Sequence, residues 1–249
     1  MKAGTLTKAL SVSVLVLAAV AAQASGVLGS NLVVNGDAES GAGGNGNAIV
    51  AAPGFLSSGS FTVVSYAAGG GFPAARDPGP SSRGSNFFAG GPNAPQSSAT
   101  QSFDVSSILG LIDGGAVSFE LAAYLGGFSS QQDNAMLTAT FLGASGDVLG
   151  AGSVGPVTHT DRGNATGLLL RQTSGAVPVG TRFIDLQLTL TRQAGSYNDG
   201  YADNLSLVLS AVPESSTIAM LGSGLAVLGL CRRRRHAGLA VDGRHEPKV

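Results

Sequence analysis

The sequence predicts an all-β protein: an antiparallel β-sandwich, with a jelly roll as the expected topology, flanked by an N-terminal signal peptide and a C-terminal transmembrane sorting helix. Three observations predict this fold class. Short segments alternate apolar and polar residues, which is the pattern of strands with one buried face. Loops rich in glycine, asparagine, aspartate and proline separate them, and the chain contains 38 glycines. Helical character is confined to segment 106–112, which is long enough for one or two turns.

Four segments show the alternation most clearly. In Phe183–Leu190 the apolar residues fall at every second position from Ile184 to Leu190, so one face is apolar and the other polar. The same pattern predicts strands at 116–124, 136–141 and 204–209.

Weaker signals predict the remaining strands and the long loops. The weaker candidate strands are 32–34, 61–66, 98–105 and 167–171. Segments 37–48 and 67–95 are dominated by small and turn-forming residues, so we expect long loops there. The apolar pair Phe87–Phe88 lies in the second of these loops, and we expect it to pin the loop to the core.

The body of the chain, residues 25–211, is acidic and contains no lysine. Its six arginines and twelve acidic residues give a net charge near −6. Nucleic acids and anionic membranes attract basic patches, so this charge argues against both and suits neutral glycans and divalent cations. The only cysteine, Cys231, lies outside the body, which therefore has no disulfide. The chain has no tryptophan, which leaves tyrosine and phenylalanine to stack on sugars.

The N-terminus has the pattern of a secretory signal peptide. Residues 1–8 carry two lysines, residues 9–21 are apolar, and Ala22 and Ala24 form an A-x-A cleavage site. We therefore expect signal peptidase to remove residues 1–24. An uncleaved N-terminal anchor is the alternative.

The C-terminal segment has the three parts of a membrane sorting signal. A hinge of Val212, Pro213 and Glu214 leads into an uncharged segment of about 15 residues. This length is at or below the ~17–25 residues that a membrane-spanning helix needs. The basic cluster that follows, typical of a cytoplasmic stop signal, consists of Arg232, Arg233, Arg234 and Arg235. A plain tail anchor without processing is the alternative.

Residues 212–235 resemble the PEP-CTERM sorting signal of Gram-negative bacteria. The resemblance implies recognition by an exosortase, a membrane protease that cuts near the Pro-Glu hinge. The chain would be anchored in the inner membrane before processing and would lie at the cell surface or outside the cell afterwards. Two features depart from the family pattern. Ser215 stands where a second proline is usual, and residues 236–249 extend the chain as a cytoplasmic tail beyond the arginines.

Both ends of the body carry motifs that combine asparagine with acidic residues. Asn31–Glu39 reads NLVVNGDAE, and Asp199–Leu207 reads DGYADNLSL. They resemble the first and last strands of galactose-binding-like jelly rolls, the fold of many carbohydrate-binding modules. The resemblance implies that the two strands lie close together and that Glu39 and Asp203 bind a structural calcium ion. Calcium prefers oxygen ligands, which an acidic body can supply. The alternative is that these acids are ordinary turn, strand-edge and loop residues.

The body shows no sequence motif of a familiar enzyme class. Its only histidine, His159, lies in a polar segment, and we find no nucleophile elbow, zinc-binding helix or phosphate-binding loop. The acids occur mostly in turn sequences such as Asp113-Gly114, which turn formation alone explains. We therefore expect no catalytic residues. A glycoside hydrolase that uses scattered carboxylates is the least favoured alternative.

The residues best suited to bind a glycan cluster in Tyr197–Tyr201. We expect Tyr197, Asn198 and Tyr201 to contact the ligand, the alternative being a hairpin loop with aromatic support. The sequence thus predicts an exported, non-catalytic surface or matrix protein that binds extracellular polysaccharide. The exosortase resemblance implies an association with exopolysaccharide or biofilm. The second reading is a structural or adhesive matrix protein without a specific ligand.

Overall fold

The computed structural model describes residues 26–212, which form an all-β body. Its strands are β1 (Leu56–Ser58), β2 (Thr62–Ser65), β3 (Asn86–Pro92), β4 (Gln96–Asp104), β5 (Val117–Gly127), β6 (Asn134–Leu142), β7 (Val148–Val154), β8 (Gly167–Ala176), β9 (Phe183–Thr191) and β10 (Tyr197–Ala211). A 3-10 turn, η1 (Ser106–Ile108), and a short helix, α2 (Leu109–Asp113), join β4 to β5, where the sequence predicts helical character. Within the described range, no helix has the length and apolarity needed to cross a membrane. The predicted signal peptide, and the sorting signal from Pro213 onward, lie outside the described residues.

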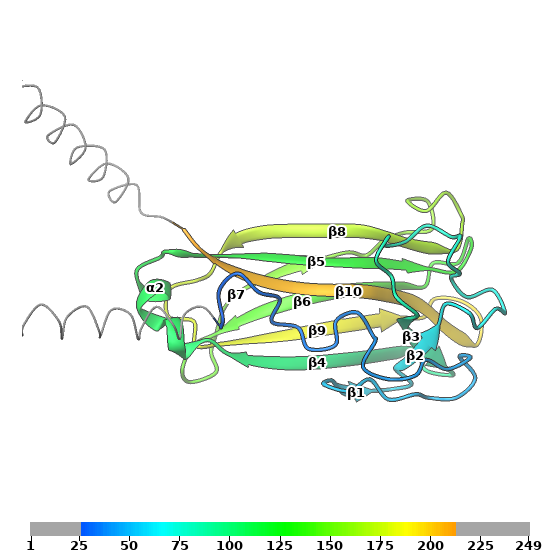
Figure 1. Ribbon diagram of the computed structural model, residues 1–249, viewed down its shortest axis with the longest axis horizontal. Helices are drawn as coiled ribbons and strands as arrows, with labels where there is room; N and C mark the ends of the chain where they lie inside the picture. The colour runs from blue at the N-terminus through cyan, green and yellow to red at the C-terminus, as the bar shows by residue number, and fades with distance from the viewer. Residues whose placement is uncertain (1–25, 213–249) are drawn as a thin grey trace, which may run out of the picture. The chain divides into compact units, whose positions relative to one another are not determined.

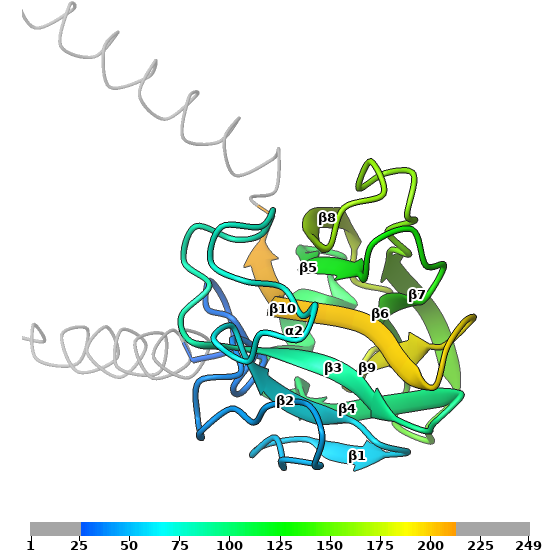
Figure 2. The same cartoon turned by 90° about the vertical axis from the view of Figure 1, so that its right-hand side faces the viewer.

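The strands form two five-stranded antiparallel sheets that pack face to face (Figure 1). The first, which we call the β9 sheet, has the order β1-β4-β9-β6-β7. The second, the β10 sheet, has the order β2-β3-β10-β5-β8. The chain passes from one sheet to the other several times, for example from β5 to β6 and from β9 to β10 (Figure 2). The predicted antiparallel β-sandwich is therefore confirmed.

The main hydrophobic core fills the space between the two sheets. β9 contributes Ile184, Leu186 and Leu188, and β10 contributes Leu205 and Leu207, all of them buried. Residues 26–212 thus contain a hydrophobic core between two sheets, which is the feature expected of a domain that folds as a unit.

Strand β3 corrects the prediction of one long loop over residues 67–95. Phe88 packs into the main core, whereas Phe87 packs into a second cluster on the opposite face of the β10 sheet. Because both faces of β3 are buried, its residues do not alternate between apolar and polar, and the sequence signal for a strand is lost. Phe87 and Phe88 do anchor this region to the core, as predicted, but they belong to strand β3 and not to a loop. The short strands β1 and β7 were also not predicted.

The two terminal motifs of the body lie side by side, as their resemblance implies, but residues 32–34 do not form the predicted strand, and this segment makes only isolated bridges, at Leu28 and Asn31. The side-chain amide of Asn31 binds the backbone of β10 through two hydrogen bonds. Its Nδ2 donates to the carbonyl oxygen of Leu205 and its Oδ1 accepts from the N–H of Leu207, both at 3.0 Å. The N–H of Leu32 donates to the carbonyl oxygen of Leu207 at 2.9 Å, and the N–H of Leu205 to that of Gly36 at 2.8 Å. A Cβ atom on Gly36 would lie 2.3 Å from the Leu205 carbonyl oxygen, so only glycine fits this contact.

Replacing Gly36 by alanine tests this contact. A new methyl group would meet backbone that cannot move cheaply, so Gly36→Ala should lower the free energy of unfolding by about 2 kcal/mol or more. The matched control is Gly41→Ala, where an added Cβ meets nothing within 4 Å, and which should change stability by about 0.5 kcal/mol at most. Urea unfolding of residues 25–212 measures both. Equal stabilities of the two variants would contradict the idea that the close contact between Gly36 and Leu205 stabilises the body.

Candidate functional site

The β9 sheet presents an open polar face because its strands alternate. In β9 the side chains of Ile184 and Leu186 point into the core, so those of Phe183, Asp185 and Gln187 point outward. Half of the outward residues of β4 and β6 are serine or threonine. This face is therefore lined with hydroxyl, amide and carboxylate groups.

The register between strands aligns these outward residues into rows across the sheet. One row consists of Leu56, Thr100, Gln187, Thr138 and Ser153. The next row consists of Ser102, Asp185, Thr140 and Ala151. A third row, at the end of the strands, consists of Asp104, Phe183, Leu142 and Val148. Side chains directly opposite each other on one face lie close enough to act on the same ligand.

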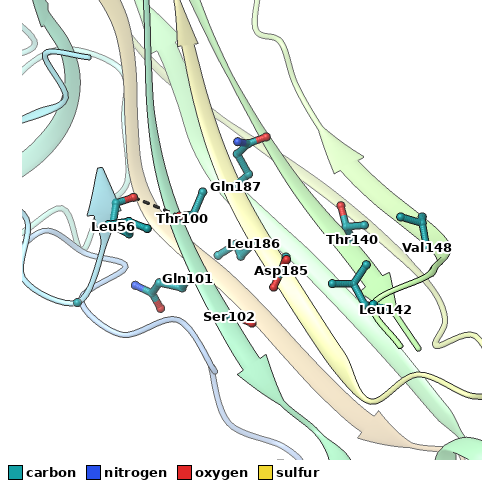
Figure 3. A pocket seen from close by; sticks show the side chains of 12 residues that line it. Leu56, Thr100, Gln101, Ser102, Thr140, Leu142, Val148, Asp185, Leu186 and Gln187 are labelled. Carbon is teal, nitrogen blue, oxygen red and sulfur yellow. Dashed lines mark hydrogen bonds between the residues drawn. The ribbon is translucent and has the colours of Figure 1, made fainter. Parts of the chain in front are cut away.

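A groove of about 760 Å³ runs over these rows (Figure 3). Its lining comes from all five strands of this sheet and the adjoining loops: Gly54, Leu56, Thr100, Gln101, Ser102, Thr140, Leu142, Gly146, Val148, Asp185, Leu186 and Gln187. Figure 3 shows Thr100 on β4, Gln187 on β9 and Thr140 on β6 around the same open space.

Most polar groups in the groove are available to a ligand. The side chains of Asp185 and Gln187 make no hydrogen bond to any described residue, and Thr100 donates only to the carbonyl oxygen of Leu56, at 3.2 Å. Gln101 is different, because its Nε2 donates to the carbonyl oxygen of Val34 at 2.7 Å and its Oε1 accepts from the N–H of Val34 at 3.0 Å. Gln101 therefore holds the N-terminal segment in place, and the other polar groups keep their hydrogen-bonding capacity.

The groove also has apolar edges. Leu56 is 79% exposed on β1 and Val148 is 68% exposed on β7, at opposite sides of the sheet. Phe183 is 37% exposed and lies on the same face as Asp185, two residues away. The groove thus combines hydrogen-bonding groups with exposed carbon surface, and the ring of Phe183 lies on the same sheet face beside the lining residues.

Sequence reasoning named none of these groove residues as site residues. The alternation of β9 did place Asp185 and Gln187 on a polar face. Their neighbours in the rows, such as Thr100 and Thr140, are far away in the sequence. Only the strand order and register bring them together, and neither can be read from a local pattern.

The predicted glycan-binding residues lie at the start of β10, away from this groove. Asn198 is fully buried; its Nδ2 donates to the carbonyl oxygen of Leu190 at 2.9 Å, and its Oδ1 accepts from the N–H of Gly200 at 3.2 Å. Asn198 therefore faces the protein interior and stabilises the strand. Tyr197 and Tyr201 line a separate, smaller pocket. Their predicted contact with a glycan stays a prediction.

The predicted calcium ligands Glu39 and Asp203 are each engaged with the protein. The N–H groups of Ser85 and Asn86 both donate to Oε1 of Glu39 at 2.8 Å. The hydroxyl of Tyr66 donates to Oδ2 of Asp203 at 2.7 Å. Burial raises the pKa of Asp203 to about 7, and the nearby carboxylate of Glu39 contributes to the rise.

The fit of calcium to these residues is partial. Two carboxylates that repel each other favour a cation between them, and Oε2 of Glu39 accepts no hydrogen bond from the described residues. However, no group of three or more histidine, cysteine, aspartate or glutamate residues converges anywhere in the range 26–212. A calcium ion here would need backbone carbonyl and water oxygens as its other ligands. The calcium site stays a prediction.

Comparisons with known proteins assign no family to this chain. No family model matches it, and no curated protein matches it significantly. Among solved structures, a cyclase from Fischerella sp. TAU is similar over 74% of this chain and 98% of its own, with 10% identity and a TM-score of 0.49. TmCBM61, solved in complex with β-1,4-galactotriose, is similar over 72% of this chain and 97% of its own, with 15% identity and a TM-score of 0.42.

The chain also resembles part of the enzymatically active domain of bacteriophage CBA120 tailspike protein 4. That similarity covers 72% of this chain but only 21% of the tailspike, with 16% identity and a TM-score of 0.43. All three similarities have TM-scores below 0.5, so none of them indicates a function for this chain.

Calcium binding can be tested by thermal melting of residues 25–212. If Glu39 and Asp203 hold calcium, the melting temperature should rise with calcium relative to chelator, since a ligand that binds only the native state stabilises it. Glu39→Gln and Asp203→Asn should each abolish the rise, whereas the control Glu120→Gln, on the exposed side of β5, should keep it. An unchanged melting temperature of the unmodified protein at millimolar calcium would contradict the site.

Proposed function

We propose that the body binds a neutral polysaccharide along the groove of the β9 sheet and does not cleave it. One observation carries this proposal: rows of hydroxyl, amide and carboxylate side chains cross an open face of the β9 sheet, and the groove over this face has room for a polysaccharide chain. Polysaccharides present repeating hydroxyl groups along an extended chain. Rows of short polar side chains are a suitable counterpart, because each can exchange a hydrogen bond with a sugar hydroxyl.

The charge of the groove favours a neutral ligand. Among the described residues that line it, there is no lysine or arginine, and Asp185 is the only acid. Anionic polymers would meet this carboxylate and a body of net charge near −6 without any compensating cation. A neutral sugar chain meets no such penalty and can donate hydroxyl hydrogen bonds to Asp185.

The dimensions favour a chain over a single sugar. Strands in a sheet lie about 4.8 Å apart, so the five strands of the β9 sheet span roughly 19 Å from first to last. The groove lining extends in this direction, from Leu56 on β1 to Val148 on β7. Several sugar rings fit along such a path. The exposed carbon surface of Leu56, Val148 and Phe183 can pack against the apolar faces of those rings.

The groove lacks the carboxylate pair that glycoside hydrolysis requires. Asp185 is the single acid in the lining, whereas hydrolysis uses two carboxyl groups, one of them a protonated general acid. Asp104 lies at the strand end, but hydrogen bonds from the side chain and the backbone N–H of Ser106 lower its pKa. A carboxyl group held ionised in this way is not suited to donate a proton. This chemistry supports a binding function.

We further propose that the chain is exported and processed by an exosortase-type protease, so that the body reaches the cell surface or the extracellular matrix. The support is the order of a signal-peptide pattern, a body with its own core, and the hinge, apolar segment and arginine cluster of the tail. A polysaccharide ligand in the matrix would then connect the protein to exopolysaccharide or biofilm.

Glycan binding can be measured by affinity electrophoresis and calorimetry with soluble laminarin, xylan and galactan, and with alginate as an anionic control. We expect binding to at least one neutral polymer and none to alginate. Gln187→Ala and Phe183→Ala should each weaken it about five- to tenfold, since a lost hydrogen bond or stacking contact costs about 1–1.4 kcal/mol.

The matched control for the groove is Gln172→Ala, which removes an exposed glutamine from β8 on the other sheet. This variant should bind as tightly as the unmodified protein. Equal weakening by Gln172→Ala and Gln187→Ala would place the ligand elsewhere. Failure to bind any glycan would favour a matrix protein without a ligand, and release of reducing ends would favour a hydrolase.

Processing can be followed in a Gram-negative host that has an exosortase. Mass spectrometry should find released body that ends near Val212 and lacks the arginine cluster. Glu214→Gln should reduce release strongly, because the hinge is the expected recognition element, whereas Glu246→Gln in the tail extension should not. Retention of the intact tail in the membrane for all three proteins would contradict processing and leave a plain tail anchor.

A further inference from the structure

A second, smaller pocket opens at the beginning of β10 and is walled by aromatic rings. Its volume is about 250 Å³, and it is lined by Asn47, Gly70, Gly71, Phe72, Phe128, Tyr197, Asp199 and Tyr201. It shares no lining residue with the groove of the β9 sheet. This volume is below the usual ~300–1,000 Å³ of pockets for drug-sized ligands, so the pocket suits a small group.

The rings of this pocket pack against one another in fixed orientations. The Phe72 ring lies 5.2 Å from that of Tyr197 in an edge-to-face arrangement and 6.1 Å from that of Tyr201. Behind them, Phe87 packs edge-to-face on Tyr201 at 5.4 Å. Ring pairs of this kind hold their geometry, so the aromatic walls are preformed.

Two glycines let the backbone approach these rings closely. A Cβ atom would lie 2.3 Å from Cζ of Phe72 if added to Gly46, and 2.7 Å from Cε2 of Phe128 if added to Gly71. Both glycines also have positive φ angles, +85° and +95°, which side-chain-bearing residues rarely adopt. The loops around the pocket can therefore enclose the rings only with glycine at these positions.

One carboxylate faces this aromatic pocket without a cationic partner. Asp199 is half-buried, and the hydroxyl of Tyr201 donates to its Oδ1. Its backbone N–H donates to Oδ2 of the buried Asp133 at 2.8 Å, which fixes its position. Burial raises the pKa of Asp199 to about 6, and Asp133 adds to the rise, so the group is still mostly ionised at pH 7.

The nearby Arg162 does not neutralise Asp199. Its guanidinium donates to the carbonyl oxygens of Ser129 at 2.9 Å and Gln131 at 3.2 Å, and it forms no ion pair among the described residues. It also does not line the pocket. A further polar group lacks a partner, because the hydroxyl of Tyr197 is buried and makes no hydrogen bond to any described residue.

We propose that this pocket binds a small organic cation that carries a methylated ammonium group, such as the trimethylammonium of choline. Aromatic faces attract such cations, and an adjacent carboxylate adds charge attraction in a partly desolvated site. The methyl groups suit the aromatic walls, and the positive charge would lie near Asp199. An inorganic cation would require several more oxygen ligands than this pocket provides.

The test is calorimetric titration of residues 25–212 with choline and with its neutral isostere 3,3-dimethylbutan-1-ol. Choline should bind, and the isostere, which has the same shape without the charge, should bind at least about tenfold more weakly. Asp199→Asn and Tyr197→Leu should each weaken choline binding by a similar factor. The control Asp147→Asn, which changes an aspartate in the exposed turn between β6 and β7, should leave it unchanged.

Circular dichroism establishes that each variant is folded, and Phe128→Leu replaces any variant that is not. Free choline and a phosphocholine headgroup share this chemistry, so co-sedimentation with phosphatidylcholine vesicles, against phosphatidylglycerol vesicles, distinguishes the two sources. Binding of either source that is lost in the pocket variants supports the proposal. Equal binding of choline and the neutral isostere, binding of neutral monosaccharides in place of choline, or no binding of either source would overturn it.

Discussion

The proposed function depends on the polar face of the β9 sheet. Inward apolar and outward polar side chains alternate along β9, which pairs with β4 and β6, and this alternation decides which residues the face presents. Ile184, Leu186 and Leu188 are committed to the core, and a slip of one residue would turn these side chains out and bury Asp185 and Gln187. Burying an unpaired carboxylate and exposing several leucines would cost far more than any single contact in the sandwich. The pairing of β9 with β4 and β6 in this register is what assembles the rows of the groove.

The sequence predicts the strands with one buried face and fails where that condition is not met. β9 was predicted from Phe183 to Leu190 and is observed from Phe183 to Thr191. β3 was missed because loops cover the outer face of its sheet, which buries both Phe87 and Phe88. The closeness of the two terminal motifs in space was predicted from their resemblance to the first and last strands of known jelly rolls. The groove was not, because its rows combine residues from strands that are distant in the sequence and have no shared local pattern.

The two binding surfaces proposed here differ in the chemistry that they offer. The groove of the β9 sheet is open, has no aromatic ring among its described lining residues and presents mostly neutral hydrogen-bonding groups. The pocket at the start of β10 is small and aromatic, and its carboxylate has no cationic partner among the described residues. Sequence reasoning identified Tyr197 and Tyr201 as candidate ligand contacts from their composition. Their burial beside Asp199 explains why the same residues suit a small cation better than an extended chain.

The most direct test of the groove is a titration of isotope-labelled residues 25–212 with a neutral soluble polysaccharide, followed by backbone amide chemical shifts. Binding along the β9 sheet predicts shift changes concentrated in β4, β9 and β6, at positions such as Thr100, Gln187 and Thr140, with little change in β8. Shift changes confined to the β10 sheet or to the aromatic pocket, or no changes with any neutral polysaccharide, would contradict the central claim.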